Sequence, residues 1–155
     1  MEYTQAFLDA RVNEEKRYVF ERFTRDDAKM LGDMLYETSL DYERPVAIEI
    51  TVNGLCVYRF FPEGTSLHNE VWLRAKEKTV HRMGMSSLRL AAQLALKHSA
   101  PEDEKLDNVT YCACGGGFPL VLRNGGLVGS ICVSGLPHLQ DHQVIIDTLK
   151  KYWAL

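Results

Sequence analysis

The sequence predicts an α+β fold in which helices pack on an antiparallel sheet. Two Asn-Gly dipeptides, Asn53-Gly54 and Asn124-Gly125, each lie between runs rich in β-branched and aromatic residues, as the turns of β-hairpins do. The segments between the hairpins have apolar residues at helical spacing, and strands do not alternate with helices as in βαβ units. The element order is therefore α-β-β-α-α-β-β-α, which argues against a doubly wound nucleotide-binding fold.

Four helices are expected around the two hairpins. Thr24 and Asp27 form a capping-box pattern at the start of the first helix. Gly84 should end the second, because glycine weakens a helix interior. The residues before Thr24 give no clear signal, so residues 1–23 are treated as an N-terminal extension of undetermined structure. The expected helices are Thr24–Leu40, residues 69–82, residues 86–98, with Ser86 or Ser87 as the start, and a last helix that opens at Pro137.

A two-residue turn fixes the register of each hairpin. Both faces of the first hairpin are largely apolar, which predicts layers on both sides of the sheet. The pairs predicted for the first hairpin are Val52–Leu55, Ile50–Val57 and Ala47–Phe60. The pairs predicted for the second are Leu122–Leu127, Leu120–Gly129, Phe118–Ile131 and Val121–Val128.

Length and composition indicate one globular domain over residues 1–155. With 46% hydrophobic and 25% charged residues, the chain has no disordered character. The net charge of -3 argues against a nucleic-acid partner. The N-terminus lacks a secretory pattern, and no apolar run approaches the ~20 residues of a membrane span, so we expect a cytoplasmic protein that does not interact with a membrane.

The cysteines and histidines give no metal site. Cys112 and Cys114 have C-x-C spacing, but no second motif supplies the remaining ligands of a structural zinc. On a strand the two thiols would face the same side, so packing is the default interpretation and a redox-sensitive dithiol stays open. His138 and His142 would share a face of the last helix, but a third ligand cannot be identified.

A glycine run follows the two cysteines. Gly115-Gly116-Gly117 permits close approach of the backbone to a ligand or to a neighbouring element. It has neither the Gly-Lys-Ser/Thr ending of a phosphate loop nor the following helix of a dinucleotide fingerprint. A bend leading into the second hairpin is the simpler interpretation.

The run from Arg74 to Arg82 in the second predicted helix has a local charge of +3. Either this is a solvated face or it is an anion site, since arginine pairs bidentately with carboxylate and phosphate. Trp72, on the same helix, either stacks on a planar ligand or belongs to the core. The charged residues are Arg74, Lys76, Lys78 and Arg82, against Glu77.

Several segments between Thr24 and the C-terminus carry a resemblance to a known family. They are Arg44–Ile48, Trp72–Lys76, Arg82–Ser87, Gly115–Leu120 and Val133–Pro137, with Asp141-His142. In these segments the chain resembles the haem-degrading-domain superfamily named after the GlcG and HbpS proteins, and most closely its uncharacterised-protein-family (UPF) branch. The resemblance implies a profilin-like domain of α/β/α layers, a homo-oligomer, and association with haem or another small anionic ligand.

The resemblance also implies which residues form the site. The basic residues would contact an anion, the glycines would allow backbone approach, and the serines would cap a helix or donate hydrogen bonds. Two departures stand out, because Cys114 and Met85 occupy positions where relatives commonly have histidine. Thiolate and thioether can ligate haem iron, but neither replaces imidazole as a general acid or base. The implied ligand-binding residues are Trp72, Arg74, Lys76, Arg82, Ser86, Ser87, Gly115, Gly116 and His142.

Two functions remain open at this point. The first is binding of a small anionic ligand, with haem as the leading candidate. The alternative is a non-catalytic oligomeric scaffold or partner-binding module in which the same residues form subunit contacts. Enzymatic haem degradation rests on the family name alone, because the sequence offers no complete catalytic constellation.

Overall fold

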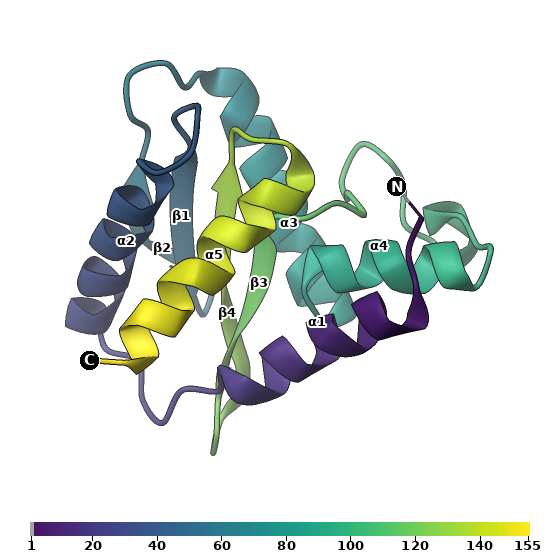
Figure 1. Ribbon diagram of the computed structural model, residues 1–155, viewed down its shortest axis with the longest axis horizontal. Helices are drawn as coiled ribbons and strands as arrows, with labels where there is room; N and C mark the ends of the chain where they lie inside the picture. Colours follow the sequence, from purple (N-terminus) through teal and green to yellow (C-terminus); the bar gives the residue numbers. More distant parts are fainter. Residues whose placement is uncertain (1) are drawn as a thin grey trace.

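The computed structural model describes residues 2–155 as a four-stranded antiparallel sheet with helices on both faces (Figure 1). The strand order is β2-β1-β4-β3, so the two hairpins join through the pairing of β1 with β4. This arrangement confirms the predicted α+β class. The strands are β1 (Ala47–Val52), β2 (Leu55–Phe60), β3 (Gly117–Leu122) and β4 (Gly126–Ser134).

The helices form a layer on each side of the sheet. In Figure 1, α2 and α5 cross the near face and α3 lies behind it, while α1 and α4 pack together beside β3. No helix within residues 2–155 has the length and apolar character needed to cross a membrane. The helices are α1 (Gln5–Arg17), α2 (Arg25–Ser39), α3 (Leu67–Met83), α4 (Ser87–Leu96) and α5 (His138–Trp153), with a 3-10 helix η1 (Pro101–Glu104).

Local capping interactions set the helix ends. At the start of α2, Thr24 Oγ1 accepts a bond from Asp27 N–H at 3.1 Å, and Asp27 Oδ2 accepts one from Thr24 N–H at 2.8 Å. This is the predicted capping box. Gly84 ends α3 in the left-handed region, with φ of 67°, where glycine is favoured. Ser86 Oγ then accepts from Arg89 N–H at 3.1 Å and begins α4.

The N-terminal extension contains α1, which sequence signals do not reveal. No α1 residue is buried, so the helix lacks the apolar stripe that predicts amphipathic helices. Polar contacts attach it instead. Glu14 Oε1 lies 2.8 Å from His142 Nε2, and Glu15 Oε1 accepts a bond from Arg89 at 2.9 Å. After α1, Phe20 forms a bridge to the end of β3.

The first hairpin has the predicted turn but a different register beyond it. Asn53 and Gly54 have φ of 51° and 80°, as a two-residue turn of this type requires. A β-bulge then leaves Val57 as an extra residue on β2. The predicted pairs Ile50–Val57 and Ala47–Phe60 are therefore wrong, and the observed pairs are Val52–Leu55, Ile50–Tyr58 and Ile48–Phe60.

In the second hairpin, two irregularities cancel. The loop has three residues, because Leu122 pairs with Gly126 instead of Leu127. A bulge at Val128 restores the register, so the predicted Val121–Val128 pair is wrong. The pairs further from the turn, Leu120–Gly129 and Phe118–Ile131, are as predicted.

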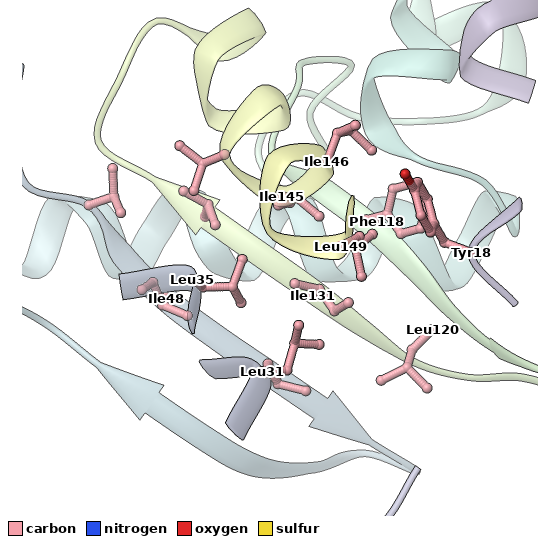
Figure 2. Close-up of a cluster of buried hydrophobic side chains, with 14 of the residues drawn as sticks. Tyr18, Leu31, Leu35, Ile48, Phe118, Leu120, Ile131, Ile145, Ile146 and Leu149 are labelled. Carbon is pink, nitrogen blue, oxygen red and sulfur yellow. The ribbon is translucent and has the colours of Figure 1, made fainter. Parts of the chain in front are cut away.

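The main core lies between the sheet and the layer of α2 and α5 (Figure 2). Leu31 and Leu35 of α2 and Ile145 and Leu149 of α5 are fully buried there. They pack over Ile48, Phe118, Leu120 and Ile131 of the sheet. A smaller cluster of Ala47, Leu73 and Cys132 fills the opposite face under α3. The fold thus holds α3 and α5 on opposite faces, and the middle of α3 and the first turn of α5 both lie beside the glycine run.

Candidate ligand-binding site

A buried ion pair lies where α3 and α5 approach the end of β4. Lys76 Nζ donates to Asp141 Oδ2 at 3.0 Å and to the carbonyl oxygen of Val133 at 2.8 Å. The second carboxylate oxygen of Asp141 accepts from Leu136 N–H at 2.9 Å. Burial raises the pKa of Asp141, while the Lys76 ammonium and these hydrogen bonds act in the opposite direction. Both charges are thus held in fixed positions.

The glycine run packs directly against this pair. Gly116 has φ of 118°, and a Cβ there would lie 2.5 Å from both Lys76 Nζ and the Val133 carbonyl oxygen. A Cβ at Gly115 would collide with the backbone carbonyl of His138. The close approach that the glycines permit is therefore to α3 and α5. Ser87, fully buried, accepts a bond from Gly117 N–H at 2.9 Å and joins α4 to the start of β3.

A cavity of 440 Å³ opens beside the ion pair. Its polar lining includes Arg44, Asn69, Lys76, Ser134, His138 and Asp141. Arg44 is exposed and forms no ion pair with any residue in the range 2–155. Positive charge and hydrogen-bond donors at the wall suit an anionic group.

His138 contributes a neutral donor to this cavity. Its Nδ1 accepts a bond from Gly115 N–H at 2.9 Å, so Nε2 carries the proton in the neutral ring. Burial, together with the Lys76 ammonium, lowers the pKa of His138 and favours that neutral form. The ring can therefore donate from Nε2 without being charged.

A second, more apolar cavity of 380 Å³ adjoins the first. Its lining includes Val71, Ala75, Leu106, Val109 and Tyr111, from α3 and the segment after η1. His68, Trp72 and Cys114 line both cavities, which makes the two spaces adjacent.

Trp72 is not a core residue, since 41% of it is exposed. Its Nε1–H donates to Nε2 of His68 at 3.1 Å. This bond fixes the two rings relative to each other at the wall that both cavities share. Of the two interpretations that the sequence left open for this tryptophan, the core one is wrong.

The two arginines expected to contact an anion have protein partners instead. Arg74 forms ion pairs with Glu49, Glu70 and Glu77. Arg82 donates to the hydroxyl of Tyr111 at 3.1 Å, and its guanidinium lies 5.5 Å from the ring centroid. Neither arginine lines either cavity. Within the run of charge +3, Arg74 is compensated by Glu70 and Glu77 of its own helix and by Glu49 of β1, which is 1% exposed, and Lys76 is compensated by Asp141 of α5.

Other predicted site residues also lie apart from the cavities. Ser86 caps α4, and its N–H donates to Glu15 at 3.0 Å. His142 is buried against Glu14 of α1. Met85 packs with a satellite cluster around Leu90 and Leu94. The structure therefore brings Trp72 and Lys76 to the cavity, with Gly115 and Gly116 behind Lys76.

Sequence reasoning missed Arg44, His68 and His138 as residues that line the cavity. His68 precedes Trp72 by four residues, a spacing that places two helical side chains on one face, so this signal was available. Arg44 and His138 come from distant parts of the chain, and only the tertiary fold brings them to the same cavity.

The two cysteines of the C-x-C motif lie in the loop before β3, and their sulfur atoms are 3.0 Å apart. They are free thiols in a loop and not on a strand, which was the placement considered from the sequence. Thr79 Oγ1 accepts a hydrogen bond from the backbone N–H of Cys112 at 3.0 Å. Among residues 2–155 there is no cluster of three or more histidine, cysteine or carboxylate side chains that could hold a metal ion.

The chain is similar in sequence and in structure to several known proteins. Residues 23–150 match the family described as "Haem degrading protein HbpS-like". A UPF0303 protein of Streptomyces coelicolor is 36% identical over 140 residues, which are 90% of this chain and 89% of that protein. The crystal structure of Ybr137w protein aligns over 96% of this chain and 88% of its own, with a TM-score of 0.86 and 28% identity. A crystal structure described as a PduOC:Heme complex aligns over 83% of this chain and 93% of its own, with a TM-score of 0.69 and 19% identity.

Proposed function

This chain belongs to the HbpS-like family of haem degrading proteins, and from that premise we propose that it binds a small planar anionic ligand, with haem as the leading candidate. The ligand would occupy the two adjoining cavities that meet at Trp72. Haem is the first candidate among such ligands because the similar PduOC structure is described as a heme complex. The single observation that carries the proposal is the exposed indole between a polar and an apolar space.

The chemistry of the two cavities suits the two parts of such a ligand. An aromatic ring system would lie against the apolar lining of Val71, Leu106 and Val109. Its carboxylates would point toward Arg44 and the Nε2–H of His138. Lys76 already donates hydrogen bonds to Asp141 and Val133. Its contribution to ligand binding is therefore its positive charge and not a free hydrogen-bond donor.

The shared wall also offers two side chains of the kind that hold haem iron. Cys114 supplies a sulfur and His68 an imidazole, and both types serve as axial ligands in haem proteins, although Nε2 of His68 would have to release the Trp72 N–H before it could bind iron. Hydrogen bonding from Cys112 and the positive charge of Lys76 lower the pKa of Cys114 against the effects of burial and of the Asp141 carboxylate, which favours the thiolate that iron prefers. His68 and Cys114 are therefore side chains of a type that fits haem.

A titration of the reduced protein with hemin, followed by absorption, tests the proposal. We expect a saturable Soret shift at fixed stoichiometry, and at least about a tenfold weaker affinity in Arg44→Ala, because each 1.4 kcal/mol of lost interaction is a factor of ten. Arg123→Ala is the matched control, since Arg123 is also exposed but pairs with Glu21, away from both cavities. A shift that does not saturate, or equal losses in both variants, would contradict the proposal.

Iron ligation is tested separately with protoporphyrin IX, which lacks the metal. If His68 or Cys114 ligates iron, His68→Ala or Cys114→Ser should weaken hemin binding more than porphyrin binding. Equal effects on the two ligands would support a site for the ring and its carboxylates alone.

Self-association is the second candidate function, and exposed aliphatic residues favour it. Leu67 and Val71 of α3 are 80% and 57% exposed, and Val109 is 85% exposed. Apolar side chains grouped on a surface often mark a contact with another protein. Light scattering of Val71→Asp and Val109→Asp variants tests this candidate, which predicts a lower mass than that of the unaltered protein. An unchanged mass would count against it.

A further inference from the structure

The motif Cys112-x-Cys114 holds two thiols in reactive proximity. Their sulfur atoms are 3.0 Å apart, within the distance at which one thiol hydrogen-bonds to the other. The loop that carries them is fixed at two points, by the bond from Cys112 N–H to Thr79 and by the bond from Gly115 N–H to His138. These two hydrogen bonds hold the loop in place, and the loop in turn holds the two sulfur atoms close together.

The surroundings of the two sulfurs differ. Cys114 lines both cavities, and the first cavity also contains the ammonium of Lys76. A small solute that enters the first cavity therefore reaches Cys114 beside the Lys76 ammonium, which stabilises a thiolate, while the nearby Asp141 carboxylate acts in the opposite direction. Cys112 lines only the second cavity. It can donate its S–H proton to a thiolate at Cys114, which raises its own pKa and lowers that of its neighbour.

The other two cysteines lack these features. Cys132 is buried on the face under α3, and burial raises its pKa to about 12. Cys56 is exposed on β2, yet partial burial of its thiol and the nearby Glu49 raise its pKa. Cys114 is the thiol that combines access, a cation and a second sulfur within bonding reach.

We propose that Cys112 and Cys114 form a peroxide-reactive dithiol, in which Cys114 attacks a small hydroperoxide and Cys112 completes a disulfide. In the first step the Cys114 thiolate attacks one peroxide oxygen, an S–O bond forms and the O–O bond breaks. The sulfur is oxidised to sulfenic acid, and the peroxide is reduced to an alcohol, or to water if hydrogen peroxide reacts, with a proton from solvent.

In the second step the sulfur of Cys112 attacks that of Cys114. The S–S bond forms, the S–O bond breaks, and the hydroxide leaves as water with the proton from Cys112. Overall, two thiols and one hydroperoxide give a disulfide, an alcohol and water. The sulfurs need to move only from 3.0 Å to the ~2.05 Å of a disulfide. This reaction does not depend on haem binding.

Hydrogen peroxide added to the reduced, haem-free protein tests the proposal, with thiols identified by alkylation and mass spectrometry. We expect the unaltered chain to form a Cys112–Cys114 disulfide while Cys56 and Cys132 stay alkylatable. In Cys112→Ser, dimedone should trap a sulfenic acid at Cys114. In Cys114→Ser, the rate of oxidation at Cys112 should fall at least about tenfold.

Cys56→Ser serves as the matched control, because it removes an exposed thiol outside the pair and should leave the rate of disulfide formation unchanged. Three results would overturn the proposal: oxidation of Cys56 before Cys114, a Cys112–Cys114 pair that stays reduced while other thiols oxidise, or equal oxidation rates in Cys112→Ser and Cys114→Ser. All of these variants are near-isosteric, and circular dichroism checks that each is folded.

Discussion

Lys76 and Asp141 join the two helix layers of the fold, with Nζ and Oδ2 3.0 Å apart and both side chains 3% exposed. Lys76 belongs to α3 on one face of the sheet, and Asp141 belongs to α5 on the other. They meet at the end of β4, where the carbonyl of Val133 accepts a second bond from the ammonium. Loss of either partner would leave the other charge buried and unpaired.

Replacement of one partner should therefore be costly. We expect Lys76→Met to lower the free energy of unfolding by about 3–5 kcal/mol, because the carboxylate of Asp141 loses its cation. The double variant Lys76→Met with Asp141→Leu should lose less than the sum of the two single variants. Urea denaturation of the four proteins measures this coupling. Additive losses would show that the two residues act independently.

Gly116 should not tolerate a side chain. With φ of 118° and no room for a Cβ beside Lys76, Gly116→Ala should destabilise the fold by about 1–3 kcal/mol and disturb the ion pair. Gly126→Ala is the matched control, because that glycine has φ of 70° but open space around it. Thermal denaturation should show the larger loss at Gly116. Equal losses would mean that backbone strain alone, without the contact to Lys76, accounts for the effect.

His138 should make stability depend on pH. Burial and Lys76 hold its pKa below the ordinary value of 6.5, so the unfolded chain binds this proton more tightly than the folded chain. The contribution of His138 to the free energy of unfolding is present in full above pH 6.5. It is lost as the pH falls from 6.5 toward the pKa of His138 in the folded state. Protonation also removes the acceptor for Gly115 N–H.

Urea denaturation between about pH 7.5 and pH 5.5 checks this contribution. The loss of stability on acidification should be smaller in His138→Asn than in the unaltered chain. His81→Asn is the matched control, because it makes the same replacement at an exposed histidine of α3. An unchanged slope in His138→Asn would contradict the prediction.

Helix α1 should be held mainly by its charged contacts. Glu14 bonds to His142, whose Nδ1 is buried without a hydrogen-bond partner among the described residues. We expect Glu14→Ala to weaken α1 docking by about 1.5–3 kcal/mol, the usual contribution of a hydrogen bond to a charged group. Hydrogen exchange should become faster in α1 and stay unchanged in the sheet. Asp9→Ala, which removes only an exposed contact with Gln5, should have little effect.

The elements that carry local signals were predictable from the sequence. The capping box at Thr24 and Asp27 and the turn at Asn53-Gly54 depend on neighbouring residues, and both are confirmed. Helix α1 was not predictable, because its attachment depends on Arg89 and His142, which are distant in sequence. The bulge at Val57 has no strong local signal, so the register beyond it was wrong.

The candidate site was predictable only in part. Trp72 and Lys76 do lie at the cavity, but local charge counting could not show that Glu49, from another element, pairs with Arg74. A positive run on a helix predicts an anion site only when no carboxylate from elsewhere neutralises it. The unpaired cation at the cavity is Arg44, which lies in the loop before β1. No other positively charged residue lies next to it in the sequence, so a search for runs of positive charge does not find it.

The fluorescence of Trp72 tests the central proposal most directly. The chain has two tryptophans, and Trp153→Phe leaves Trp72 as the single reporter while keeping an aromatic ring against Phe20. If a planar anionic ligand occupies the two cavities, hemin and protoporphyrin IX should each quench this fluorescence saturably, and Arg44→Ala should shift the curve to higher ligand concentration. Quenching that rises linearly without saturation, or a curve that Arg44→Ala leaves unmoved, would contradict the account.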